Sequence, residues 1–480
     1  MNPATSGTSG TSGTSGSSST SGTSGTSGPT AAATAPQARP ATVMVAVACG
    51  FVMAMLDVTI VNVALKAMQN SLAMSLTTLV WVVDAYTLSF AALLLLGGAL
   101  ANRYGSKTIY LLGLTLFVAA SALCALAATP AMLIAARLLQ GVGAALFMPS
   151  SLSLLTLAFP PGPLRTRMIG IWGALVSAAM ALGPCVGGVL VDAIGWRGIF
   201  WVNLPVGVAG LWLTQRYVAR SPRHAGPLNG TGHLLAAVAL AALSLTLIQG
   251  PSLGWTSPAI VAGAITTIAA TAAFVLRERF ARYRILSAAL LGERRFVAGS
   301  VLGLAINFGI LAEIFLISLY LQQQRGSSPL VTGFQLFPLM AMFGIGNLAT
   351  ARVSARLGSR GALLTGLALA TLGSAALLGI DALPYGAIAL CIGVANFGAG
   401  LAIPAMNLVV MQAARPEDAN LAAASLNASR QIGSLVGVAI ASVVLHSFAD
   451  AGRATAAGFA IIAAAYAGGF AVVVRAIKPG

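Results

Sequence analysis

Long apolar runs separated by short polar connections make up most of the chain. Each run is long enough for a helix that crosses a bilayer, which needs about 20 apolar residues. The pattern predicts an all-α polytopic membrane protein with fourteen transmembrane helices. They are expected at residues 42–65, 79–101, 109–128, 131–153, 168–190, 199–217, 234–250, 259–276, 296–320, 331–350, 362–380, 385–402, 421–445 and 456–474.

Two pairs of short motifs repeat at nearly one offset. RYGSK at 103–107 is matched by RLGSR at 356–360, 253 residues later. GAALFMP at 143–149 is matched by GAGLAIP at 398–404, 255 residues later. Parallel repeats of this kind are typical of alternating-access transporters. We therefore expect two related six-helix bundles, with an extra helix pair at 234–276 between them.

This repeat divides the chain into five parts. TSG triplets fill residues 5–28, and such a low-complexity stretch is expected to have no fixed structure. The basic segment before the second half is amphipathic, so it is expected to lie along the inner membrane surface. The expected parts are a disordered cytoplasmic tail (1–41), a first bundle (42–217), the inserted pair (234–276), a cytoplasmic interfacial linker (277–295) and a second bundle (296–474).

Composition supports a membrane protein and excludes other classes. Hydrophobic residues make up 58% of the chain and charged residues only 8%, whereas soluble domains have about 25% charged residues. The four cysteines lie in apolar runs without paired spacing, so neither a disulfide framework nor a metal site is indicated. There is no Walker loop and no polar catalytic cluster. We expect no cofactor and no enzymatic activity.

The net charge of +16 reflects an asymmetric distribution of Lys and Arg. With fourteen helices, 20 of the 26 basic residues fall on the side of the two termini and 4 on the other side, while Arg137 and Arg430 lie within spans. Basic residues are enriched in cytoplasmic loops. The pattern therefore places both termini in the cytoplasm and explains the charge without nucleic acid as a partner.

Asp57 lies inside the first span, which otherwise suits hydrocarbon. A carboxylate there costs about 2.5–3.5 kcal/mol, so it must face protein, water or a cation. Arg137 lies at a similar depth in the fourth span and is within reach of Asp57. The pair is either a static link between two helices or a proton or cation site. We favour the second interpretation because acids within membranes are usually functional.

Two other acids and three amides are further candidates. Glu313 is the only acid within a span of the second half, and nothing in the sequence pairs with it, which favours a protonatable role. Asp84 lies near the start of the second span, close to water, where a solvated carboxylate is as plausible as a functional one. Asn62, Asn307 and Asn396 lie on spans, where they either face a cavity or form helix-packing hydrogen bonds.

The sequence resembles the fourteen-helix drug:proton antiporters of the major facilitator superfamily. The resemblance runs in order through the chain after residue 42. It rests on LDVTIVNVAL (56–65), GALANRYGSK (98–107), RLLQGVGAA (137–145), GPCVGG (183–188), GWRGIFWVNLPVG (195–207), YLQQQRGSSPLVTG (320–333) and NASRQIG (427–433).

The resemblance implies the major facilitator fold, a location in the bacterial inner membrane and roles for particular residues. It implies proton coupling through Asp57, Arg137, Glu313 and Asp84, with substrate contacts from Asp57, Asn62, Glu313, Asn307 and Asn396. Conformational roles are implied for Asn102, Arg103, Gly105, Lys107, Gly183, Pro184, Gly187, Gly188 and Arg430. Asn102 stands where the family carries Asp, so we predict a weaker cytoplasmic latch.

The function expected from these features is export of amphipathic, lipophilic or cationic small molecules in exchange for protons. Two alternatives stay open: a dedicated exporter of one metabolite, such as an antibiotic or an amino acid, or a membrane protein that does not transport. The expected partners are the substrate, protons and membrane lipid, and a monomeric state is compatible with the sequence.

Overall fold

The computed structural model describes residues 40–159, 162–223, 229–281, 285, 288–415 and 418–477. Nearly all of the predicted tail (1–41) and part of the predicted linker (277–295) lie outside these ranges. The described residues form helices and no strands. These are α1 (Pro40–Leu72), α2 (Leu76–Tyr104), α3 (Ser106–Ala125), α4 (Pro130–Ala158), α5 (Pro163–Ile194), α6 (Gly198–Trp201), α7 (Asn203–Tyr217), α8 (Gly230–Leu253), α9 (Pro258–Phe280), α10 (Ala288–Gly292), α11 (Arg294–Gln323), α12 (Pro329–Ala375), η1 (Ala376–Ala382), α13 (Tyr385–Ala413), α14 (Ala419–Ser447) and α15 (Ala451–Ala476).

The apolar runs form helices because only a helix satisfies every backbone hydrogen bond of a single segment in hydrocarbon. Twelve described helices are long and apolar enough to cross a membrane. One of them, α12, contains a break at Gly358, and the short helices α6 and α7 together occupy the predicted sixth span. The predicted number of fourteen is therefore approximate, because it depends on how these two regions are divided.

Most helices extend several residues beyond the apolar runs that predicted them. The first predicted span ends at residue 65, whereas α1 continues to Leu72. Backbone hydrogen bonding continues past the point where the side chains become polar, so apolar length underestimates helix length. Side-chain caps mark some of the true starts: Ser75, Thr129 and Ser328 each accept a hydrogen bond from a backbone amide in the first turn of the next helix.

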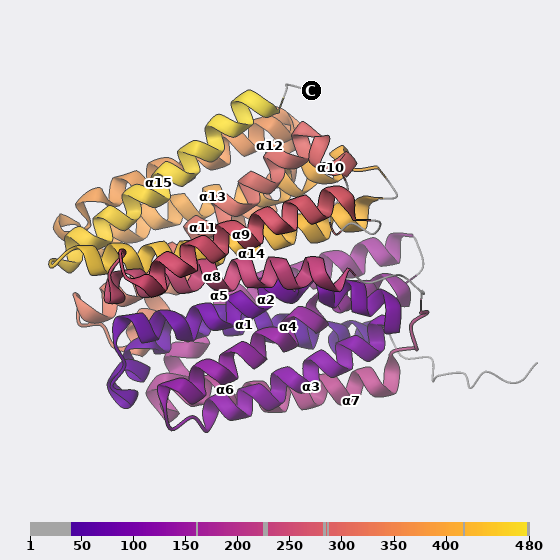
Figure 1. Cartoon of the computed structure of the whole chain (residues 1–480), viewed down its shortest axis with the longest axis horizontal. Coiled ribbons are helices and arrows are strands. Elements are labelled where there is room, and N and C mark those ends of the chain that lie inside the picture. The colour runs from indigo at the N-terminus through magenta and orange to yellow at the C-terminus, as the bar shows by residue number, and fades with distance from the viewer. Residues whose placement is uncertain are drawn as a thin grey trace, which may run out of the picture. The chain divides into compact units, whose positions relative to one another are not determined.

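Two groups of helices pack within themselves and meet each other along two seams. In the first half α4 packs on α2 and α3, and α1 packs on α5 and α7; in the second half α12 packs on α13, and α11 packs on α14 and α15. The halves meet where α5 contacts α12 and where α2 contacts α14. The inserted helices α8 and α9 pack on each other, and α8 contacts both α2 and α14 (Figure 1).

Hydrogen bonds between the two halves gather toward one end of the helices. Among described residues these bonds all lie in the part of the helices nearest the α1–α2 and α11–α12 connections, away from Pro40. The halves are therefore closed against each other at this end. The bonds join Thr77 Oγ1 and His446 Nε2 (3.2 Å), Ser318 Oγ and the Asn62 carbonyl (2.8 Å), Gln323 Nε2 and Gln69 Oε1 (3.4 Å), and Cys185 Sγ and the Gly333 carbonyl (3.5 Å).

Candidate functional site

Asp57 lies at the centre of a buried polar network in the first half. Arg137 Nη1 donates to Asp57 Oδ2 at 2.5 Å, and both residues are only 1% exposed. Gln140 Nε2 and Asn203 Nδ2 approach the other carboxylate oxygen at 3.3 and 3.5 Å. The same two amides also donate to Ser121 Oγ. Side chains from α4 and α7 thus bind the Asp57 carboxylate of α1. Ser121 of α3 accepts hydrogen bonds from two of these side chains and so holds them in place.

The guanidinium of Arg137 is held by several groups besides Asp57. Its Nε donates to the Val82 carbonyl at 3.0 Å, and its Nη1 also donates to Gln140 Oε1 at 2.8 Å. Its Cζ lies 4.6 Å from the centre of the Tyr86 ring, which is a cation–π distance. α4 comes this close to α2 because Gly141 has no side chain: a Cβ there would collide with the Tyr86 carbonyl.

This network meets the requirement for a charge pair inside a membrane protein. A buried ion pair offsets its desolvation cost only where further hydrogen bonds satisfy both groups, and here both Asp57 oxygens accept such bonds. Gln140 and Asn203 were part of motifs identified in the sequence, but no role was assigned to them there, and Ser121 was not recognised. Only the helix packing shows that these three meet Asp57.

Glu313 is the corresponding buried acid in the second half. It lies on α11, is 1% exposed, and accepts a hydrogen bond from Asn396 Nδ2 of α13. The sequence suggested no partner for Glu313, and the structure corrects this point. It makes no ion pair with any described residue, so its neighbour is a neutral amide, whereas Asp57 has a cation.

Asp84 differs from the sequence expectation more clearly. The sequence left open a solvated carboxylate near the end of α2, but Asp84 is 0% exposed. That alternative is therefore wrong, because α2 begins at Leu76 and neighbouring helices cover this turn. Neither carboxylate oxygen has a hydrogen-bond partner among the described residues. Buried polar groups without partners are rare and call for an explanation.

Asn62 and Asn307 do not form the helix-packing bonds that the sequence left open. Asn62 Nδ2 donates to the Val58 carbonyl, and Asn307 Nδ2 donates to the Gly303 carbonyl, each one turn back in its own helix. Oδ1 of Asn62 is buried and has no hydrogen-bond partner among the residues that the structure describes. The two candidate acids, Asp57 and Glu313, stay in separate halves, and no hydrogen bond among described residues joins them.

The glycines of the GPCVGG motif form a contact face on α5. A Cβ at Gly183 would collide with the Thr59 hydroxyl, and one at Gly187 with Ile60, so α5 packs directly on the α1 motif that carries Asp57. A Cβ at Gly188 would lie 2.7 Å from the Pro329 carbonyl of α12. Pro184 lies within the helix, and its carbonyl faces Gly333 of α12. The motif therefore contacts both halves at the closed end.

Replacing Gly333 by valine is expected to open this end. The new side chain would overlap the Pro184 carbonyl, and overpacking of this kind costs about 1–3 kcal/mol. A cysteine placed at Thr77, which is 8% exposed, should then react with a thiol reagent about tenfold faster. Gly344→Val on the same helix is the control, since no atom lies within 4 Å of its Cβ position. Equal rates in both variants would contradict the contact argument.

The loop-motif residues lie where α2 ends and α3 begins. Asn102 and Arg103 are exposed, and Gly105 has a positive φ of 91° at the junction. Lys107 Nζ donates to the Val218 carbonyl at 2.7 Å, beyond the end of α7. Arg430 lies on α14 with a buried Nε that has no hydrogen-bond partner among described residues. The weaker latch at Asn102 stays a prediction.

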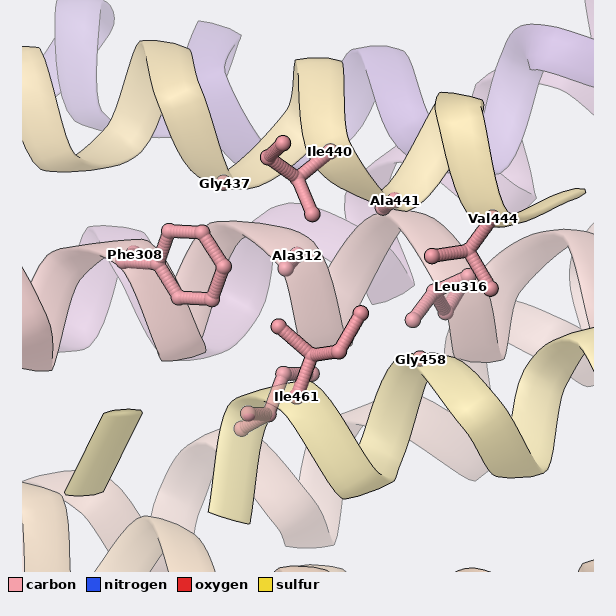
Figure 2. A pocket seen from close by; sticks show the side chains of 10 residues that line it. Phe308, Ala312, Leu316, Gly437, Ile440, Ala441, Val444, Gly458 and Ile461 are labelled. Carbon is pink, nitrogen blue, oxygen red and sulfur yellow. The ribbon is translucent and has the colours of Figure 1, made fainter. Parts of the chain in front are cut away.

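The apolar space between α11, α14 and α15 is a packing contact and not a binding cavity. Figure 2 shows Phe308, Ala312 and Leu316 of α11 facing Ile440 of α14 and Ile461 of α15. The space among them is too small for a water molecule. Phe308 packs here between helices of the second half.

Comparison with known proteins agrees with this architecture. The Major Facilitator Superfamily model matches residues 47–438. The methylenomycin A resistance protein of Bacillus subtilis is 47% identical over 427 residues, covering 88% of this chain and 92% of that protein. The multidrug resistance protein Stp of Mycobacterium tuberculosis is 35% identical, with 85% of this chain and 76% of that protein covered.

A solved structure shows the same fold at low sequence identity. It is that of a bacterial homologue of the human lysosomal transporter Spinster in an inward-facing and unoccupied conformation. It aligns with a TM-score of 0.62 at 18% identity, covering 91% of this chain and 94% of that one. The chain therefore belongs to the major facilitator superfamily, a family of multi-pass membrane transporters and not of enzymes.

Proposed function

We propose that the protein exports amphipathic, lipophilic or cationic small molecules in exchange for protons. The observation that carries the proposal is a fully buried carboxyl group on the first helix of each half, Asp57 on α1 and Glu313 on α11. Two relatives are named for resistance to methylenomycin A and to multiple drugs, which supports an export function.

The two carboxyl groups have different neighbours, which suggests different tasks. Asp57 is bound to a fixed guanidinium, so a substrate or a helix shift must disturb Arg137 before Asp57 takes up a proton. Among the described residues Glu313 has only the amide of Asn396 as a polar partner, so its protonation breaks no ion pair there. Asp84, buried on α2 without a hydrogen-bond partner in the described part of the chain, is a third candidate for proton transfer.

Alternating access requires the halves to separate at the end where they now meet. The bonds between Thr77 and His446 and between Gln69 and Gln323 would break in that step. With both termini in the cytoplasm, as the distribution of Lys and Arg indicates, the closed end faces outward. A proton gradient supplies about 2.3 kcal/mol per charge per 100 mV, which corresponds to about 40-fold accumulation.

Transport into inverted membrane vesicles tests the proposal. A fluorescent lipophilic cation should accumulate when the vesicles are energised, and an uncoupler should abolish the signal. Vesicles without the protein provide the background. Accumulation that persists at the same rate with the uncoupler would contradict proton-driven exchange.

A dedicated exporter of one antibiotic is the second candidate. It is supported by the 47% identical relative, whose name specifies resistance to a single compound, methylenomycin A. Growth inhibition of cells with and without the protein distinguishes the two. Protection against methylenomycin A alone favours the dedicated exporter, and protection against several unrelated lipophilic cations favours the broad one.

A further inference from the structure

The two loops of the internal repeat have the same backbone turn but different surroundings. Gly105 and Gly358 hold corresponding positions, with positive φ angles of 91° and 70°. In the first half the chain after α7 covers the turn: Lys107 Nζ donates to the Gln215 and Val218 carbonyls at 3.0 and 2.7 Å. A Cβ at Gly105 would lie 3.2 Å from the Ser221 carbonyl. The space beside the first loop is therefore occupied by the chain that follows α7.

The second loop opens into a cavity. No atom lies within 4 Å of the Cβ position at Gly358, and the adjoining cavity has a volume of about 540 Å³. This volume lies within the range of small-ligand sites, about 300–1,000 Å³. Arg295 of α11, Arg356 and Arg360 of α12, and Gln412 of α13 contribute to its lining, and none of the described lining residues is acidic.

The three arginines have few protein partners. Arg360 Nε donates to the Ile477 carbonyl at 2.7 Å, which holds its guanidinium beside the cavity. The side chains of Arg295 and Arg356 make no ion pair or hydrogen bond with described residues. Guanidinium groups gathered around one space without a carboxylate attract an anion, and their planar donor pattern matches phosphate oxygens. The cavity is thus chemically suited to a phosphate group.

The position of the cavity indicates where the phosphate comes from. Arg295 lies at the start of α11, Gly358 at the break in α12 and Gln412 at the end of α13. Helix ends of this kind lie at the depth of lipid headgroups, where basic pockets bind anionic lipids. We propose that this cavity binds the phosphate group of an anionic phospholipid.

Native mass spectrometry of the purified full-length protein tests the proposal. Phosphatidylglycerol, phosphatidylcholine and inorganic phosphate are titrated separately in detergent. Phosphatidylglycerol should bind in a one-to-one complex, and the double variant Arg356→Gln/Arg360→Gln should weaken this binding by about tenfold or more, since each lost charge-assisted bond is worth about 1.5 kcal/mol or more. Arg352→Gln is the matched control, because Arg352 is an exposed arginine of α12 outside the cavity lining.

A second variant separates loss of the site from loss of the fold. Gln412→Phe keeps all three arginines but fills part of the cavity, so it should also weaken phosphatidylglycerol binding while thermal unfolding stays unchanged. Competition by inorganic phosphate at equal strength would make soluble phosphate the ligand and overturn the lipid assignment. Equal binding by the double variant, Gln412→Phe and Arg352→Gln would overturn the site itself. None of these outcomes depends on transport.

Discussion

Replacing Asp57 by asparagine is expected to reduce proton-driven export to background, a loss of about 100-fold or more. The amide cannot take up a proton, and it leaves the 1% exposed Arg137 without its counter-charge. Removing one partner of a buried ion pair costs about 3–5 kcal/mol, which is enough to shift helix packing as well as chemistry. Dye accumulation in inverted vesicles measures the transport effect.

Two comparisons separate the chemistry of Asp57 from folding. Asp192→Asn, at an exposed acid near the end of α5, should transport normally. Arg137→Lys keeps the positive charge but removes the guanidinium group, whose separate nitrogens donate to both Val82 and Gln140. We therefore expect an intermediate loss of transport. Normal export by folded Asp57→Asn protein would show that the pair is only a static link between α1 and α4.

Replacing Glu313 by glutamine is expected to separate substrate binding from proton coupling. Glutamine has nearly the same shape, and its carbonyl oxygen can accept the bond from Asn396 Nδ2, so the packing of α11 on α13 should be kept. Substrate binding should change by less than about threefold, within 1 kcal/mol. Accumulation driven by a pH gradient should fall by about tenfold or more, because a proton site is removed.

The measurement pairs equilibrium binding with transport in the same preparation. Asn396→Ala serves as the matched comparison, since it removes the partner but keeps the carboxyl group; transport should fall less than in Glu313→Gln. If Glu313→Gln accumulates substrate as fast as the unaltered protein at every pH gradient tested, Glu313 is not a coupling site. Loss of binding together with transport would instead assign Glu313 to the substrate.

The sequence predicted the fold well because hydrophobic length and loop charge are local properties. It predicted the Asp57–Arg137 pair because both residues lie at matching depths in otherwise apolar spans. Gln140, Asn203 and Ser121 could not be assigned, since polar residues on three separate helices meet only through packing. For the same reason the sequence could not decide between a solvated and a functional Asp84: its distance from the helix start says nothing about which neighbours cover it.

The break in α12 shows a further limit. Gly358 was recognised in a repeated motif, and its positive φ agrees with the turn that glycine permits. What lies beside each of the two matching turns depends on segments distant in the sequence, such as the chain after α7 that contacts Lys107. No local pattern of residues predicts such contacts.

The position of the inserted helices bears on how lipophilic molecules enter the protein from the bilayer. α8 covers the seam between α2 and α14, while the seam between α5 and α12 has no such cover from this pair. If a lipophilic compound enters from the bilayer, we therefore expect it to enter along the α5–α12 seam, after that seam has opened, and not along the seam that α8 covers.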